Sequence, residues 1–524
     1  MSARASAADE HARWLARNEP DRDEREGMAA EAAAVERPPR LAALMVVADE
    51  DEIWIKRSVE SVLVQAGGGV ELWICDNGSR RRHVAESLAR IASADRRVRV
   101  KTLGAPLGMT GALRAALSLG DADYAWVLEP GDELAPDAAF RVAEMVRRGD
   151  VDVVYTDEDR IDVTGERSEP TFKPYFSADL LQAEPYLGSW CVIRRRLLQD
   201  SLEALDRESG AGGEHALQLE LSRSGARFRH LPAVLYQRRV PPGDVVPAPG
   251  GDAPATAEAE VAPEAPDPAL APTVSAIVLR AGGRPPPSVA NSPLTIAGRP
   301  VEETIVAGSG SRPARDDVFD PSPARVANLA AERAAGEFLL FLDGRARLEV
   351  GAEGWLSRML AFGSRPGVGA VGLRVVEPGP RKRFLGVGAL VGHPPSHPPG
   401  AKGAGPAHRP PASRHPFNAW ALTGECMLVR RTAFEGAGCF AAQDFPSGLY
   451  DVDLCLRLRR GGLANVLLGE SAIVPGALLR PVPADEIALL WSRWWPELAT
   501  VLHYESAPSR APLYRLERDA ALAT

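Results

Sequence analysis

The sequence predicts an α/β protein with two three-layer domains, each built on a mainly parallel central sheet, after a helical N-terminal lead-in. Residues 122–134 (ADYAWVLEPGDEL) and 336–348 (GEFLLFLDGRARL) carry this prediction. Each stretch runs from small residues through a short apolar segment to a polar break that holds a carboxylate. Open α/β sheets place their ligands where buried strands end in this way. Because the pattern occurs twice, we expect two related domains that handle a nucleotide or a phosphate.

The segments around the first stretch alternate between two apolar patterns. Short apolar runs indicate buried strands, and apolar residues at helical spacing indicate covering helices. We expect strands at 41–48, 70–75 and 98–103, and helices at 53–65, 83–92, 108–119 and 136–148. This order predicts parallel strands whose two faces are covered by helices.

Changes in composition predict where the domains begin and end. Residues 1–38 are rich in good helix formers, with Trp14 as the expected anchor. Residues 241–272 combine proline, alanine and acidic residues without an apolar period, which predicts a disordered linker. A strand pattern at 273–279 and a helix pattern at 353–362 then restart the order. The expected organisation is an extension at 1–38, domains at 39–240 and 273–480 around the linker, and a tail at 481–524 that docks through Trp491, Trp494 and Trp495.

Composition excludes several classes of function. The chain of 524 residues is too long for one core, and its 45% hydrophobic and 25% charged residues are ordinary for a globular protein. A net charge of −9 argues against nucleic acid as the main partner. Five scattered cysteines without a CxxC pair argue against structural zinc and against a disulfide framework. Because neither a signal peptide nor a spanning helix is evident, we expect a cytoplasmic protein that would reach the inner face of the membrane through a partner or a surface helix.

Several spaced motifs resemble those of one known family. In the first half they are Asn18-Glu19-Pro20 after Trp14, the turn at 74–79, the run at 155–159, Phe172-Lys173-Pro174 and Leu180-Leu181. In the second half they are residues 369–372, TGECMLVRR at 423–431 and DVDLCLR at 451–457. Together they resemble the inverting family 2 glycosyltransferases with a GT-A fold, and in particular the tandem proteins of O-antigen and surface-polysaccharide assembly. The resemblance covers most of residues 10–240 and 273–475.

This resemblance implies transfer of a sugar from a nucleotide-sugar donor to a growing glycan or a lipid-linked acceptor. It also implies a divalent cation, Mn²⁺ or Mg²⁺, that offsets charge on the departing diphosphate. In the first domain it assigns the nucleotide to Asp76, the cation to Glu129 and Asp132, and the acceptor proton to Glu214, with His215 as its helper. The acidic residues Asp157 and Asp159 would lie near the donor or the acceptor.

The second domain keeps the acidic residues expected for the base, whereas its donor-side motif is altered. Asp451 and Asp453 are kept, and the resemblance makes Asp451 the base and Asp453 a residue that binds the cofactor. On the donor side, Asp343 is a single carboxylate close to Arg345 and Arg347, and guanidinium groups oppose a cation. Either the two arginines grip phosphate directly or this domain no longer uses a nucleotide-sugar.

Each of these residues also has a purely structural interpretation. Asp76 can cap its own turn, Glu129 and Asp132 can form a polar turn, and the acidic run 157–159 can be a solvated loop. Carboxylates such as Glu214, Asp451 and Asp453 favour the first turn of a helix in any protein. The rival functions are therefore a glycan-binding or scaffold pseudoenzyme and a nucleotide-binding regulator that needs only Asp76 and its sheet edge.

Overall fold

The computed structural model describes most of residues 19–240 and parts of residues 272–494. The described residues are 11, 15–16, 19–67, 69–171, 173, 176–208, 213–240, 272–281, 295–296, 299–301, 303–309, 318–319, 322–344, 346–348, 354–376, 384–386, 415–473, 483, 485–486, 488–490 and 492–494. The chain divides into two compact units, which we call unit 1, within Met1–Gly251, and unit 2, within Asp252–Glu505.

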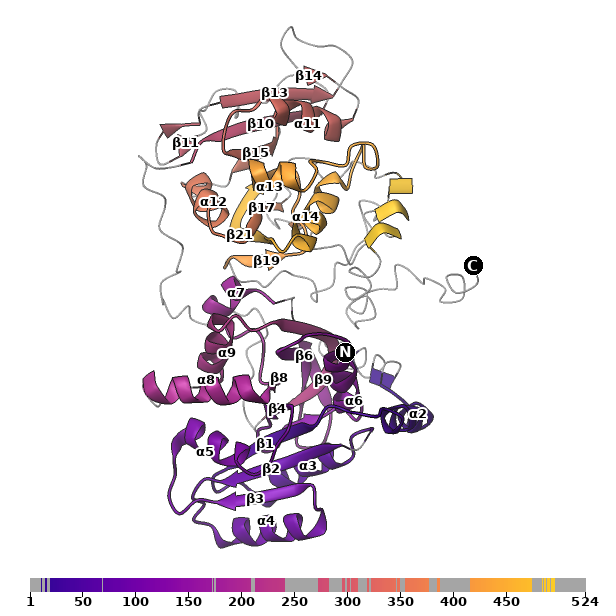
Figure 1. Cartoon of the computed structure of the whole chain (residues 1–524), viewed down its shortest axis with the longest axis vertical. Helices are drawn as coiled ribbons and strands as arrows, with labels where there is room; N and C mark the ends of the chain where they lie inside the picture. The colour runs from indigo at the N-terminus through magenta and orange to yellow at the C-terminus, as the bar shows by residue number, and fades with distance from the viewer. Residues whose placement is uncertain are drawn as a thin grey trace, which may run out of the picture. The chain divides into compact units, whose positions relative to one another are not determined.

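Unit 1 alternates strands and helices as the sequence predicts (Figure 1). Its strands are β1 (Leu41–Val47), β2 (Val70–Asp76), β3 (Val98–Thr102), β4 (Tyr124–Val127), β5 (Glu133–Leu134), β6 (Val153–Ile161), β7 (Arg167–Thr171), β8 (Cys191–Arg194) and β9 (Phe228–Arg239). Its helices are α2 (Arg22–Ala33), α3 (Glu52–Leu63), α4 (Arg82–Ala94), α5 (Gly108–Leu117), α6 (Ala138–Arg148), α7 (Ala178–Ala183), α8 (Arg195–Glu208) and α9 (Glu214–Arg223).

The sheet of unit 1 has a parallel half and a mixed half. Its strand order is β3-β2-β1-β4-β8-β6-β9-β5, with β7 paired to β6. The first four strands are parallel, whereas β8 runs antiparallel between β4 and β6, and β6 pairs with β9 in parallel. Because β1, β2 and β4 are parallel neighbours, the loops that follow them meet at one edge of the sheet, where α/β folds bind ligands.

Two apolar layers cover this sheet, as a three-layer domain requires. One layer joins α3, α4 and α6 to the sheet through residues such as Ile55, Val84 and Val142. The other joins α5, α8 and α9 through residues such as Leu113, Leu202 and Leu221. The amphipathic spacing read from the sequence therefore corresponds to real buried faces.

Unit 2 repeats this architecture. Its strands are β10 (Val274–Ala281), β11 (Thr295–Ile296), β12 (Arg299–Pro300), β13 (Glu303–Ser309), β14 (Val318–Phe319), β15 (Phe338–Asp343), β16 (Arg347–Leu348), β17 (Val368–Val376), β18 (Phe384–Gly386), β19 (Phe417–Ala419), β20 (Cys426–Arg430) and β21 (Ala464–Ile473). Its helices are α11 (Pro323–Arg333), α12 (Trp355–Gly363), α13 (Arg431–Gly436) and α14 (Tyr450–Arg460).

The two main sheets match strand for strand. The order β14-β13-β10-β15-β20-β17-β21-β16 has the same sequence of parallel and antiparallel neighbours as the sheet of unit 1. Strand β4 of unit 1 thus corresponds to β15, β6 to β17, β8 to β20 and β9 to β21. The expectation of two related α/β domains with mainly parallel sheets is confirmed.

The predicted elements coincide with the observed ones within a few residues, with one clear exception. The sequence left open that the acidic run at 157–159 is a solvated loop, but this run lies inside strand β6, and Asp157 and Asp159 are each 1% exposed. The predicted linker at 241–272 and the predicted anchor at Trp14 lie outside the described residues. Within the expected tail, Trp494 is buried and donates a hydrogen bond to Asp453, whereas Trp491 and Trp495 lie outside the described residues.

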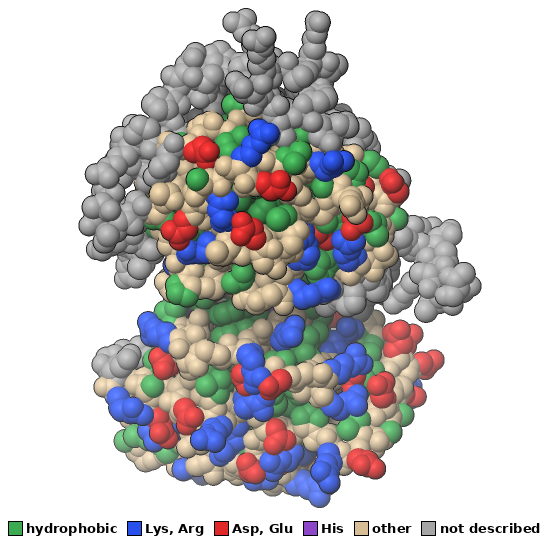
Figure 2. Space-filling model, turned by 45° about the horizontal axis from the view of Figure 1, so that its top comes forward, with side chains coloured by type: hydrophobic (Ala, Val, Ile, Leu, Met, Phe, Trp, Pro, Cys, Tyr) green, Lys and Arg blue, Asp and Glu red, His purple; other side chains and the backbone are tan. Residues whose placement is uncertain are grey.

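The surface and the helix lengths bear on the expected partners. Figure 2 shows basic and acidic side chains interspersed over the visible face, in keeping with 61 basic and 70 acidic residues in the chain. Of the helices in the described part of the chain, none is both long enough and apolar enough to cross a bilayer.

Candidate active site

The acidic turn after strand β4 is held tightly by its neighbours. The backbone N–H of Asp132 donates to the carbonyl of Glu129 at 3.0 Å, which closes the turn. The buried hydroxyl of Ser58, on α3, donates to the carbonyl of Asp132 at 2.7 Å and accepts from the N–H of Gly131 at 2.8 Å. Gly131 has φ +98°, and an added Cβ would lie 2.4 Å from Cδ of Arg239. The turn is therefore specific in shape, and only glycine fits its third position.

The two carboxylates of this turn have different environments. Glu129 is exposed, whereas Asp132 is 3% exposed and accepts hydrogen bonds from the hydroxyl of Tyr236 and from the N–H of Arg239. Burial raises the pKa of Asp132 to about 7, although both hydrogen bonds lower it, and the charge of Glu129 contributes to the increase. Asp132 consequently takes up a proton near neutral pH.

The pKa of Asp132 predicts a pH dependence of stability. In the unfolded chain this carboxyl has a pKa near its ordinary 3.8, so only the folded state holds the proton between that value and about 7. Stability from this group is fully present only below the unfolded pKa and is lost as pH rises up to and through the folded value, including about 1.4 kcal/mol between pH 6 and pH 8. In urea titrations with EDTA, we expect Asp132→Asn to remove this loss. Equal slopes for both proteins would contradict the prediction.

Strand β6 presents its acidic residues to opposite faces, because strand side chains alternate. Asp157 accepts from the N–H of Lys173 at 2.8 Å and contacts His230 Nε2 at 2.9 Å. Asp159 lies 2.9 Å from His11 Nε2 and accepts from Arg167 Nε at 2.8 Å. Both carboxylates thus hold the fold together, and their assignment to the cofactor stays a prediction.

Glu158, between them, faces the other way. It accepts from the buried ammonium of Lys173 at 2.7 Å, and that ammonium also donates to the carbonyl of Leu187 at 2.7 Å. Gly188 passes so close that an added Cβ would lie 2.2 Å from both charged groups. The turn before β8 is thereby fixed against the acidic strand.

Glu214 begins helix α9 beside this same turn. It accepts a hydrogen bond from Gln218 at 3.1 Å, and Gln218 also donates to the carbonyl of Gly188 at 2.8 Å. Partial burial raises the pKa of Glu214, and the charges of Glu158 and Glu129 add to this while Arg238 opposes it. Because the residue as a whole is exposed, solvent limits the increase. His215, its expected helper, instead donates Nε2–H to the carbonyl of Leu181 at 2.6 Å.

Four carboxylates of unit 1 act on one guanidinium. Burial alone would lower the pKa of Arg238, but the negative charges of its acidic neighbours raise it overall. We call these neighbours the acidic cluster, and it consists of Glu129, Asp132, Glu158 and Glu214. Three of its members were expected from the sequence to serve the reaction, and the charges of all three raise the pKa of the same guanidinium.

The cluster does not form a ready metal site. Among the described residues, no three His, Cys, Asp or Glu side chains are grouped so that they could hold a metal ion. Mg²⁺ requires six oxygen ligands in near-ideal geometry, and Asp132 already uses its oxygens for Tyr236 and the N–H of Arg239. The expectation of Mn²⁺ or Mg²⁺ at Glu129 and Asp132 stays a prediction.

The expected nucleotide edge is ordered by two aspartates. Asp76, the last residue of β2, is 1% exposed and accepts from the N–H of Ser79 at 2.9 Å, so it caps the turn that follows it. Asp49, after β1, has φ +61° and accepts from the N–H groups of Arg80 and Arg81, both at 2.7 Å. These bonds, chiefly the one from Arg81, lower the pKa of Asp49. The two loops are thus tied together, and nucleotide binding by Asp76 stays a prediction.

In unit 2 the corresponding turn has lost a carboxylate. The N–H of Ala346 donates to the carbonyl of Asp343 at 2.9 Å, as that of Asp132 does to Glu129 in unit 1. Asp343 therefore corresponds to Glu129, and Ala346 stands where Asp132 stands. Arg345 lies outside the described residues, as does the side chain of Arg347, and their effect on a cation stays a prediction.

The expected base of unit 2 keeps the place that Glu214 has in unit 1. Asp451, in the first turn of α14, accepts from the N–H of Gly424 at 2.6 Å. Gly424 precedes β20 as Gly188 precedes β8. Glu425 follows it, and burial together with the negative charge of Asp451 raises the pKa of Glu425. The site of unit 2 thus retains a pair of interacting carboxylates beside the helix end.

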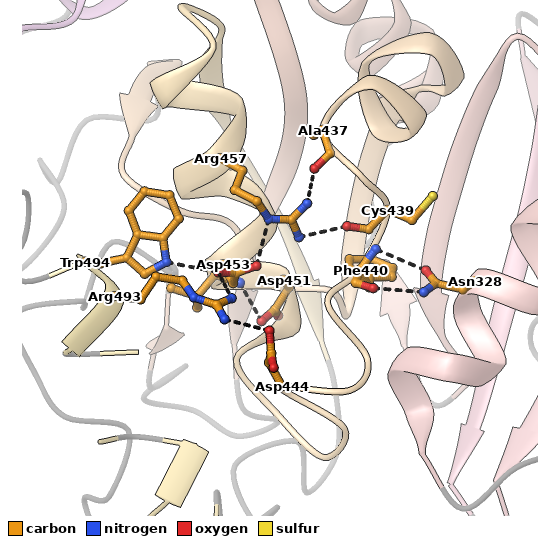
Figure 3. A network of polar contacts seen from close by, with 11 residues as sticks. Asn328, Ala437, Cys439, Phe440, Asp444, Asp451, Asp453, Arg457, Arg493 and Trp494 are labelled. Carbon is orange, nitrogen blue, oxygen red and sulfur yellow. Dashed lines mark hydrogen bonds and ion pairs between the residues drawn. The ribbon is translucent and has the colours of Figure 1, made fainter. Parts of the chain in front are cut away.

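Asp453 is held by side chains that stabilise the fold, shown in Figure 3. It is 0% exposed, and its oxygens accept from Arg457 Nε at 2.8 Å, Trp494 Nε1 at 3.0 Å and Arg493 Nη1 at 3.2 Å. Arg457 in turn donates to the carbonyls of Ala437 and Cys439. The sequence assigned Asp453 to the cofactor. The structure shows it joining α14 to the segment around Trp494, so the cofactor role stays a prediction.

Comparisons with known proteins agree with the resemblance in the sequence motifs. Residues 43–200 match the family described as Glycosyl transferase family 2. O-antigen biosynthesis protein RfbC of Myxococcus xanthus is 28% identical over 505 residues, which cover 88% of this chain and 39% of that protein. Uncharacterized protein y4gI of Sinorhizobium fredii is 27% identical over 480 residues, which cover 82% of this chain and 52% of that protein. The chain therefore spans about two-fifths to half of these relatives.

Among solved structures, S. aureus TarS 1–349 is similar with a TM-score of 0.31 and 14% identity, over 38% of this chain and 60% of that chain. Its complex with UDP gives a TM-score of 0.30 and 16% identity, over 39% and 61%.

Proposed function

We propose that this chain, whose residues 43–200 form a glycosyl transferase family 2 domain, transfers a sugar from a nucleotide-sugar donor to a glycan acceptor through unit 1. The observation that carries the proposal is the ordered acidic turn after β4, whose Asp132 accepts hydrogen bonds from Tyr236 and Arg239, at the edge where the loops after parallel strands converge. The charges of Glu158 and Glu129 both raise the pKa of Glu214, which supports a candidate base near this edge.

The chemistry proposed for this site is a single displacement with inversion. The acceptor hydroxyl attacks the anomeric carbon, and a carboxylate takes its proton. Glu214 is suited to this role because its raised pKa makes it a better base than an ordinary glutamate. The similarity to RfbC supports a surface polysaccharide or its lipid-linked precursor as acceptor, with the protein acting at the cytoplasmic face of the membrane through partners.

A thermal-shift titration tests the proposal, because a ligand that binds only the folded state raises its melting temperature. We expect UDP-sugars or dTDP-sugars to stabilise the full chain, and Asp132→Ala to abolish both this shift and donor hydrolysis. Titrations with and without Mn²⁺ measure the part played by a cation. If surface glycans bind while no nucleotide-sugar binds, the chain is a glycan-binding scaffold and the proposal is wrong.

A second candidate function applies to unit 2 alone. Ala346 replaces the buried carboxylate of the acidic turn, and the buried Asp453 is bound to Arg457, Arg493 and Trp494. These two facts favour a unit that has lost its donor side and binds glycan without turnover. Asp451→Asn would then leave sugar transfer by the full chain unchanged. If this variant abolishes transfer, both units take part in one reaction.

A further inference from the structure

The side chain of Arg239 lies directly against the acidic turn of unit 1. Arg239 is the last residue of β9, and its N–H donates to Asp132 Oδ1 at 2.8 Å. A Cβ added to Gly131 would lie 2.4 Å from Cδ and 2.5 Å from Nε of Arg239. The base of the guanidinium therefore touches the backbone of the turn, and this contact exists only because Gly131 has no side chain.

Trp54 supports the guanidinium from helix α3. The guanidinium carbon of Arg239 lies over the ring of Trp54, 4.5 Å from the ring centre. Trp54 precedes Ser58 by four residues, so both side chains leave the same face of α3, and Ser58 is the residue that hydrogen-bonds the acidic turn. A cation–π contact uses no N–H donor, so it fixes the position of the guanidinium and leaves its hydrogen-bonding capacity intact.

The other arginine beside Trp54 is already engaged. The guanidinium carbon of Arg57 lies 5.7 Å from the same ring centre, but Arg57 forms an ion pair with Glu133 at 3.6 Å and donates to two backbone carbonyls between β6 and β7. In contrast, no residue in the described part of the chain forms a hydrogen bond or an ion pair with the guanidinium of Arg239. Five N–H donors are thus held at the acidic turn without a partner among these residues.

We propose that Arg239 binds the diphosphate of the nucleotide-sugar donor at the acidic turn, an inference that rests on the proposed function. A guanidinium has the planar fork that matches phosphate oxygens in pairs, and its charge offsets the carboxylates of Glu129 and Asp132 that a diphosphate meets there. In the transfer, the bond from the anomeric carbon to the diphosphate oxygen breaks, and its electron pair leaves with the nucleoside diphosphate. The acceptor oxygen bonds to that carbon, and its proton passes to Glu214.

Unit 2 supplies an internal contrast. The pairing of β9 with β5 and of β21 with β16 aligns β9 with β21. Counted along the sequence from these pairs, Pro475 takes the place of Arg239, and Arg345 takes the place of Gly131 in the turn. The arginine and the glycine that gives it room are thus both replaced in the unit whose turn has Ala346 instead of a second carboxylate. A shared role of the two residues at the donor site predicts this joint loss.

Calorimetry of UDP and dTDP binding to the full chain, in Mn²⁺ and in EDTA, tests this inference. We expect the intact chain to bind one of these nucleotides, and Arg239→Gln to weaken that binding by about 10- to 100-fold under the same condition. Arg239→Lys keeps the charge but not the fork, so its affinity should lie between the two. Trp54→Leu should also weaken binding, because the guanidinium loses its support, whereas Trp54→Phe keeps an aromatic face and should bind nearly as the intact chain does.

The matched control is Arg229→Gln. Arg229 is an exposed arginine on the same strand, and it pairs along the sheet with Val154, away from the acidic turn. Its replacement removes the same charge from the chain and should leave nucleotide binding unchanged. If Arg229→Gln weakens binding as much as Arg239→Gln does, general loss of positive charge is responsible and the inference is wrong.

Two further outcomes separate this inference from the proposed function. If Arg239→Gln remains folded by its melting curve and binds the nucleotide as tightly as the intact chain, the inference is wrong while the proposed function stands. If the intact chain binds no nucleotide in either Mn²⁺ or EDTA, the proposed function fails and this inference fails with it.

Discussion

Replacing Asp453 with alanine is expected to lower the stability of unit 2 by about 3 kcal/mol. The carboxylate is 0% exposed and accepts from Arg457, Arg493 and Trp494, so its removal leaves buried donors and positive charges without a partner. Breaking one side of a buried charge network costs more than the network contributes in isolation. Differential scanning calorimetry of the full chain should show one transition at a lower temperature and the other unchanged.

Asp444→Ala is the matched control for Asp453→Ala. Asp444 also accepts from Arg493, at 2.6 Å, but its side chain is 46% exposed. Exposed ion pairs contribute less than about 1 kcal/mol, so its removal should scarcely move either transition. If Asp453→Ala is as mild as this control, then Asp453 does not hold the Trp494 segment in place and its role has to be sought at the site.

Replacing Glu214 with glutamine is expected to slow sugar transfer by about 10²- to 10⁴-fold, the usual loss when a general base is removed. Nucleotide binding should change little, because glutamine keeps the shape of the side chain and its contact with Gln218. In the intact chain, the rate should rise with pH as Glu214 loses its proton. Because its pKa is raised, this rise should lie at higher pH than for an ordinary glutamate. Release of UDP or dTDP in the presence of surface polysaccharide is the measurement.

Glu220→Gln controls for a general effect of charge on helix α9. Its carboxylate lies 3.7 Å from Arg223 and is not part of the acidic cluster. This variant should transfer sugar at the normal rate. A Glu214→Gln variant with full activity would move the base to another residue and would leave the donor side of the proposal intact.

Much of the fold could be predicted because apolar periodicity reports burial directly. The parallel strands β1, β2 and β3 follow short apolar runs, and helices α3 to α6 follow apolar residues at helical spacing. Strand β6 was harder to predict, because its sequence VVYTDEDRI places three acidic residues in succession. The inward carboxylates are met by Arg167, His11 and His230, and the two histidines lie far away along the chain.

The residues of the candidate site also fall into those that sequence motifs predict and those that they do not. Glu129, Asp132 and Glu214 could be proposed from motifs, because each lies at the end of a strand or the start of a helix. Glu158 and Arg238 were missed, although the alternation along β6 and the arginine pair after Tyr236 were visible signals. Their importance depends on the pairing of β6 with β9, whose residues are far apart in sequence and whose register shifts twice. Long-range register of this kind has no local signature.

The matched strand order of the two main sheets indicates how the two units arose in evolution. One ancestral half, copied within a single chain, would explain why the strands of the two main sheets have the same order and directions. After such a copying event, one half can conserve the ancestral chemistry while the other accumulates substitutions such as the alanine at 346. Each unit can therefore be compared with the other unit of the same chain. A residue's history can be tested by exchanging it with its counterpart in the other half, without recourse to another organism.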